Sequence, residues 1–236
     1  MIFGGIQKFT ILDYPDKTAC TLFIIGCNFR CPYCQNASLI KSAANPLRID
    51  EEEILDFLET RKGLLDGICI SGGEPLSYSN EEMQEEPDAF IAKVKAMGFL
   101  VKLDTNGSYP DRLKRLISSG NIDYIAMDVK NSPQKYAVTI GIPEYNVSSV
   151  HESIKLLLSS GVPHEFRTTV VRDFHTYEDL LGITEWISGA EKYFLQRFVD
   201  SATVLQKGLR EYSDTELRQF VQKLKSVMPG VELRGT

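Results

Sequence analysis

Strand-like and helical patterns alternate along this chain, and this alternation limits the possible folds more than any other feature of the sequence. Six apolar, strand-like runs occupy residues 18–25, 67–71, 100–104, 124–129, 165–171 and 193–199. Amphipathic helical patterns lie between them. Strands that alternate with helices form parallel sheets with helical crossovers. Six repeats are too few for the eight of a closed TIM barrel, so a doubly wound open sheet and an incomplete (β/α)6 barrel remain.

The expected helices carry start and stop signals. Asp50 precedes three glutamates and can cap a helix whose acidic first turn suits the helix dipole. Pro110 fits the first turn of another helix. Ser213 and Glu216 have the spacing of a capping box at the start of the last one. Two further helices are expected over 150–161 and 176–187.

The composition is that of an ordinary globular protein. The chain has 236 residues, of which 43% are hydrophobic and 25% charged, so one α/β domain over residues 1–236 is expected. A formal net charge of −6 without a long basic run argues against a nucleic-acid partner. The sequence shows no signal-peptide pattern and no apolar run near the roughly 20 residues that span a bilayer, which predicts a cytoplasmic protein without a membrane partner. The acidic stretch 80–88 is interpreted as a solvated helix start or loop.

A cluster of cysteines carries the strongest functional signal. Cys27, Cys31 and Cys34 have the spacing Cys-x3-Cys-x2-Cys, directly after the first strand-like run. Iron–sulfur cubes are normally held by four thiolates, so three could hold one cube and leave one iron open. A zinc site or chance clustering is the alternative, but structural zinc usually takes four ligands, and the three histidines are scattered. Cys20 and Cys69 lie in apolar runs and are interpreted as small buried hydrophobic residues.

Glycine and polar residues follow other strand-like runs. Gly72-Gly73-Glu74 follows the second run, where adjacent glycines let a ligand approach the backbone, although Gly-Gly is commonly only a turn. Asp104 ends the third run and Asp128 the fourth. Two carboxylates at neighbouring strand ends repel unless a cation or amine lies between them; the alternative is ordinary polar residues at strand ends. Parallel sheets place their sites at this carboxyl edge.

The cysteine spacing, with the aromatic Tyr33 before the last cysteine, resembles the signature of the radical S-adenosylmethionine (SAM) enzymes. The stretch from Gly5 to Pro15 resembles activating proteins of glycyl-radical enzymes, in particular those of anaerobic ribonucleotide reductase. The resemblance covers most of the chain, is specific from Gly5 to Asn36 and is looser after Lys130. It implies the incomplete barrel, and it implies that the three cysteines hold one [4Fe–4S] cluster.

The resemblance also implies which residues bind SAM. Gly72, Gly73 and Glu74 match the family segment that contacts the SAM amino group. Other residues of the family hold a monovalent cation, the amino-acid part of SAM or the SAM carboxylate. The residues that match them here are Asp104, Thr105, Asp128, Lys130 and Arg167.

The implied activity is reductive cleavage of SAM to a 5′-deoxyadenosyl radical, which abstracts a hydrogen from a glycine of a partner glycyl-radical enzyme. An electron donor such as flavodoxin or ferredoxin is implied with it. Two departures from the family pattern stand out: Gln35 follows the last cysteine, where many activating proteins have histidine, and Asp16 follows Pro15, where glycine is usual. In the last strand-like run, which contains Gln196, some members have a SAM-contacting histidine, and none is present here. Two alternatives remain, namely a radical SAM enzyme acting on a small molecule, as 7-carboxy-7-deazaguanine synthase does, and a non-enzymatic iron–sulfur or zinc protein.

Overall fold

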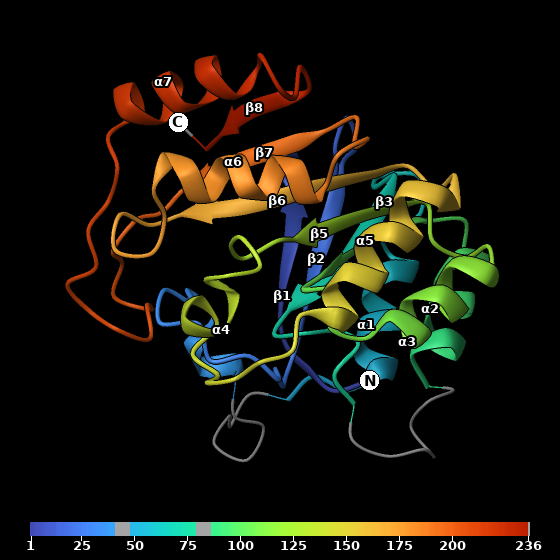
Figure 1. Cartoon of the computed structure of the whole chain (residues 1–236). Helices are drawn as coiled ribbons and strands as arrows, with labels where there is room; N and C mark the ends of the chain where they lie inside the picture. Colours follow the sequence, from blue (N-terminus) through green and yellow to red (C-terminus); the bar gives the residue numbers. More distant parts are fainter. Residues whose placement is uncertain (41–47, 79–85, 236) are drawn as a thin grey trace. The chain divides into compact units, whose positions relative to one another are not determined.

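The computed structural model describes residues 1–40, 48–78 and 86–235 (Figure 1). These residues fall into two compact units that are interleaved in sequence. Unit one comprises Met1–Asn28, Ser38–Thr105 and Asp111–Ile125, and unit two comprises Phe29–Ala37, Asn106–Pro110 and Ala126–Thr236.

The strands form an eight-stranded sheet, ordered as they occur along the chain. They are β1 (Phe3–Thr10), β2 (Ala19–Ile24), β3 (Gly67–Gly72), β4 (Leu100–Thr105), β5 (Tyr124–Asp128), β6 (His164–Val170), β7 (Tyr193–Arg197) and β8 (Val231–Arg234). The six strand-like runs in the sequence correspond to β2 through β7, so their prediction is confirmed. The first and last strands of the sheet were not predicted.

In unit one, β1 pairs with β2 in the antiparallel direction, and β2, β3 and β4 pair in parallel. Three helices belong with these strands: α1 (Glu51–Glu59), α2 (Glu86–Ala96) and α3 (Pro110–Ser118). The rings of Phe3 and Phe90 lie 5.1 Å apart in the core between the first strand and α2. Pro110 begins α3 as predicted, whereas the side chain of Asp50 makes no capping hydrogen bond to α1.

In unit two, β6, β7 and β8 pair in parallel. The accompanying helices are α4 (Tyr136–Thr139), α5 (Ser148–Ser160), α6 (Tyr177–Trp186) and α7 (Asp214–Leu224). The capping box of Ser213 and Glu216 is present, and Thr176 forms a second one with Asp179. Gly161 ends α5 in the left-handed conformation, with φ of 71°.

Two observations qualify the expectations from sequence. Most of the acidic stretch 80–88 lies outside the described residues, and α2 begins within its last part. Asp16 has a φ of 58°, a conformation that favours glycine, which gives a physical reason why glycine is usual there in the resembled proteins. No helix in the described parts of the chain is long and apolar enough to cross a membrane.

Candidate active site

Cys27 lies in the loop after β2, and Gly73 and Glu74 lie in the loop after β3. Gly73 packs against the first of these loops. Its N–H donates to the Ile24 carbonyl at 2.9 Å, and the N–H of Glu74 donates to the Gly26 carbonyl at 2.8 Å. A Cβ atom on Gly73 would lie 2.0 Å from the Gly26 oxygen and 3.4 Å from the Cβ of Cys27. Only glycine therefore allows the backbone after β3 to lie against the start of the cysteine motif.

Glu74 reaches the end of β4. Its carboxylate is buried and accepts hydrogen bonds at Oε1 from the Thr105 hydroxyl, at 2.8 Å, and from the N–H of Leu76, at 3.1 Å. The structure therefore brings Glu74 and Thr105 together at neighbouring strand ends. These contacts hold the Glu74 side chain in one place at the ends of β3 and β4.

Asp104 is held by side chains of β3 and β4. Its Oδ2 accepts a hydrogen bond from the Ser71 hydroxyl at 3.0 Å, and its Oδ1 contacts the ammonium group of Lys102. Lys102 is fully buried, and its Nζ lies 3.7 Å from the sulfur of Cys69. Lys102 is not among the residues predicted from the sequence, although a lone lysine inside an apolar strand indicates a buried charge that needs a partner.

In unit two, Cys31 and Cys34 belong to one turn. The N–H of Cys34 donates to the Cys31 carbonyl at 3.0 Å. A later segment pairs with this turn, because the N–H of Leu205 donates to the Cys34 carbonyl at 3.1 Å and the N–H of Gln206 to the Pro32 carbonyl at 2.8 Å. Burial raises the pKa of the Cys31 thiol to about 11 and also raises that of Cys34.

Tyr33 packs into an aromatic cluster behind this turn. The ring is buried, and its centroid lies 5.8 Å from that of Phe174, 6.3 Å from that of His175 and 6.4 Å from that of Phe198. Aromatic packing of Tyr33 thus holds the middle of the turn that carries Cys31 and Cys34.

Asp128, Lys130 and Arg167 form a charged triad. Lys130 Nζ and Arg167 Nε each lie 2.9 Å from a carboxylate oxygen of Asp128. Burial by itself would raise the pKa of Asp128, but the guanidinium of Arg167 and the ammonium of Lys130 outweigh burial and hold it well below its usual range. With two positive groups and one negative group, the triad carries a net charge of +1, so it can attract an anionic group.

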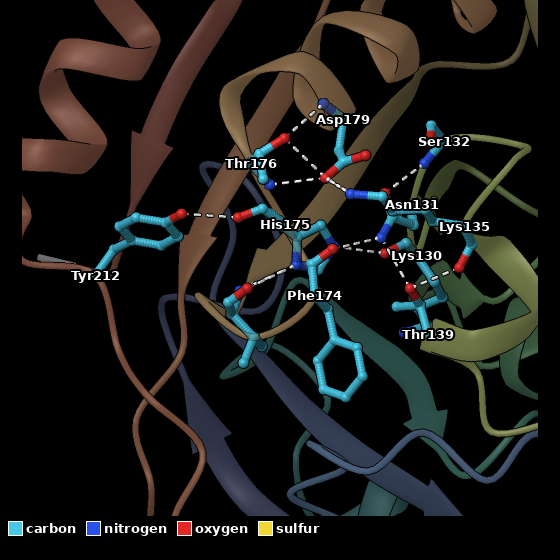
Figure 2. A network of polar contacts seen from close by, with 11 residues as sticks. Lys130, Asn131, Ser132, Lys135, Thr139, Phe174, His175, Thr176, Asp179 and Tyr212 are labelled. Atoms are coloured by element: carbon cyan, nitrogen blue, oxygen red, sulfur yellow. Dashed lines mark hydrogen bonds and ion pairs between the residues drawn. The ribbon is translucent and has the colours of Figure 1, made fainter.

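A hydrogen-bond network holds the backbone of Lys130 (Figure 2). His175 is buried, and its Nε2 lies 2.8 Å from the Lys130 carbonyl, which can only accept, so Nε2 donates. Its Nδ1 then accepts from the N–H of Val171 at 3.1 Å. The Asn131 amide donates to the Phe174 carbonyl at 3.0 Å. These bonds attach the segment after β5 to the turn after β6, so the position of Lys130 depends on both.

Other predicted residues have structural contacts. Cys20 and Cys69 are fully buried, as predicted. The side-chain amide of Gln35 donates to the Val199 carbonyl at 3.3 Å. Gln196 lies on β7, where the next residue, Arg197, forms ion pairs with acidic residues of its own unit.

The chain matches a known family. The sequence profile of the radical SAM superfamily matches residues 21–187, a span that contains the cysteine motif and the strands β3 to β6. The chain belongs to the radical SAM superfamily. It is therefore a radical SAM enzyme, and the alternative of a non-enzymatic iron–sulfur or zinc protein is excluded.

Proteins of similar sequence include activating enzymes and a small-molecule enzyme. A protein of Methanocaldococcus jannaschii with the provisional name glycyl-radical enzyme activating enzyme is 31% identical over 240 residues, covering 99% of this chain and 95% of the relative. The anaerobic ribonucleoside-triphosphate reductase-activating protein of Escherichia coli is 37% identical over 65 residues, covering 27% of this chain and 42% of that protein. A 7-carboxy-7-deazaguanine synthase of Methanopyrus kandleri is 29% identical over 122 residues, covering 44% of this chain and 46% of that enzyme.

Solved structures of radical SAM proteins share the fold. Streptococcus suis SuiB, bound to its precursor peptide SuiA, matches with a TM-score of 0.71 at 12% identity. The match covers 91% of this chain but only 48% of SuiB, so this chain spans about half the length of that protein. The likeness shows the α/β fold of the radical SAM core, with a mostly parallel sheet in an incomplete TIM-like barrel.

The donor set fits the [4Fe–4S] cluster that the radical SAM superfamily implies. All five cysteines are reduced thiols, and the three of the motif are the ligand type that such clusters take. Within the described ranges, no three cysteine, histidine, aspartate or glutamate side chains are gathered closely enough to hold a metal ion. Thiolates are the form that binds a cluster, so cluster assembly would remove the protons of the three thiols.

Proposed function

We propose that this chain activates a glycyl-radical enzyme. The observation that carries the proposal is the likeness to the M. jannaschii activating enzyme, because 31% identity extends over nearly the whole of both chains. A radical SAM core alone could serve many reactions. Likeness over the full length of both chains favours the same type of reaction more strongly than a shared motif would.

In this proposal Cys27, Cys31 and Cys34 bind one [4Fe–4S] cluster and leave one iron for SAM. When bound, the cluster would supply one electron for the cleavage of SAM to methionine and a 5′-deoxyadenosyl radical. The chain's own residues bind SAM, orient it and exclude water. Tyr33 anchors the cysteine turn through its aromatic packing.

The backbone of Gly72 and Gly73 would bind the amino group of SAM, with Glu74 held in place by Thr105. The SAM carboxylate would bind at the charged triad. Lys130 and Arg167 are both cationic hydrogen-bond donors, the type of group that binds a carboxylate. Asp104 is the last of the residues that we assign to SAM binding. All of them belong to one radical SAM domain in this proposal.

The proposed substrate is a glycine Cα of a partner protein, and anaerobic ribonucleotide reductase is the proposed partner. The 37% identity to the E. coli reductase-activating protein supports this choice, although it extends over 65 residues only. A small electron-transfer protein such as flavodoxin or ferredoxin would deliver the electron. A monovalent cation near Asp104 and Asp128 was expected as well, but both carboxylates already contact cationic side chains.

The alternative is a small-molecule substrate. It is favoured by the match to a 7-carboxy-7-deazaguanine synthase, which is 29% identical over 122 residues. The full-length likeness of the activating enzyme outweighs this shorter match. The two functions differ in where the abstracted hydrogen comes from, so the origin of that hydrogen separates them.

The test is to incubate reconstituted, reduced protein with SAM and a candidate anaerobic ribonucleotide reductase and to record the electron paramagnetic resonance spectrum. We expect a doublet that changes when the partner's glycine carries deuterium at Cα. A partner variant with alanine in place of that glycine is the matched control and should give no doublet. Cleavage of SAM coupled to turnover of a small molecule, without a protein radical, would contradict the proposal.

A further inference from the structure

A side chain of the protein itself places a positive charge beside Asp104, where the resemblance implies a monovalent cation. Lys102 lies on β4 with no exposed surface, and its ammonium group forms an ion pair with Asp104. Lysine is almost never fully buried unless its charge is paired. The side chain of Asp104 is itself only 14% exposed, so both charges lie largely outside the solvent.

Strand geometry fixes this pair. Lys102 and Asp104 are two residues apart on one strand, so their side chains leave the same face. In the parallel register, Cys69 of β3 is the partner of Lys102. Its sulfur lies 3.7 Å from Lys102 Nζ, and the hydroxyl of Ser71, two residues further on β3, donates to Asp104. Side chains of two adjacent strands therefore hold the ammonium against the carboxylate.

Charge balance follows from these contacts. A buried carboxylate needs a positive charge nearby, and Lys102 supplies it. The ion pair with Lys102 already balances the charge of Asp104, so a sodium or potassium ion is not needed for that purpose. Asp128, in unit two, is neutralised in the same manner by Lys130 and Arg167.

We propose that Lys102 takes the place of a monovalent cation at Asp104, so that binding of SAM does not depend on sodium or potassium. The proposal rests on the proposed function, since it concerns the SAM site of that enzyme. Lys102 is then a positioning residue, which holds the Asp104 carboxylate in one orientation from within the strand.

The test compares SAM affinity of the reconstituted enzyme in potassium, sodium and choline chloride at equal ionic strength. The wild-type affinity should be the same in all three salts. Lys102→Met removes the ammonium and frees a place for an ion beside Asp104. This variant should bind SAM weakly in choline and regain roughly tenfold in potassium or sodium, the size expected of one charged hydrogen bond. Lys114→Met, on the exposed face of α3, is the control and should behave as wild type.

A second measurement separates this proposal from the proposed function. Thermal unfolding of the cluster-free protein requires no SAM chemistry, and potassium should raise the Tm of Lys102→Met but not that of wild type. The double variant Lys102→Met/Asp104→Asn lacks both charges and should show no such response. Stronger SAM binding by wild type in potassium, or a Lys102→Met variant that ignores cations in both measurements, would overturn the role of Lys102. Failure to cleave SAM would overturn only the proposed function.

Discussion

Cys27, Cys31 and Cys34 lie in one loop, whereas Cys20 and Cys69 lie in the buried centres of β2 and β3. Alanine at any of the three loop positions should abolish stable cluster loading, while Cys20→Ala should keep about four irons per chain after anaerobic reconstitution. Iron and sulfide analysis measures this directly. Because burial raises the pKa of Cys31 to about 11, its thiol is protonated at neutral pH, so loading should speed up as the pH rises. A need for Cys20 would contradict the assignment of ligands.

Arg167 decides the net charge of the triad that is assigned to the SAM carboxylate. Replacing it with glutamine should leave cluster content unchanged and weaken SAM binding by about 1.5–3 kcal/mol, because the triad then has no net charge and loses a charged hydrogen-bond donor. Equilibrium binding under anaerobic conditions measures the effect. Arg115→Gln, at an exposed position of α3, is the control. Equal SAM affinity of both variants would remove Arg167 from the site.

At the scale of elements, the loops after β2 and β3 depend on each other through Gly73. Gly73→Ala should destabilise the fold by about 1–3 kcal/mol, since its Cβ would lie 2.0 Å from the Gly26 oxygen, and should reduce cluster loading by displacing Cys27. Gly5→Ala is the matched control, because a Cβ there meets its nearest atom at 3.8 Å. Thermal unfolding and iron content measure the two effects. Equal losses in both variants would show that the contact with Gly26 has no special role.

The turn after β6 is joined to the segment after β5 by neutral His175. Burial lowers the pKa of this histidine, so the unfolded chain binds its proton more readily than the folded one. The resulting stability is fully present above the unfolded pKa of about 6.5 and is lost as the pH falls through the lower folded value. We expect the Tm of wild type to fall between pH 7 and pH 5 more steeply than that of His175→Gln. Parallel pH profiles of the two proteins would contradict this.

The same elements show how far a sequence can predict this fold. Continuous apolar runs predicted β2 through β7, because strands buried on both faces require them. β1 was missed, since most of its residues are only partly buried or exposed, and β8 has only four residues. The candidate site was predicted where residues follow strand ends. The apolar run around Lys102 marks this lysine as unusual, but its contact with Cys69 follows from the alignment of β3 with β4, which no local pattern shows.

At the scale of the whole molecule, cluster, SAM and folding are linked. SAM that binds only the folded, cluster-loaded chain should stabilise it by about 2.7 kcal/mol at a concentration 100-fold above Kd. For a chain of this length, that energy corresponds to a rise in Tm of roughly 5–10 °C. Cys34→Ala, which should lack the cluster, should show almost no rise, because the iron that is proposed to bind SAM would be absent. Anaerobic thermal unfolding with and without SAM measures both proteins. An equal rise in both would mean that SAM binds independently of the cluster, which would contradict the assignment of the open iron to SAM.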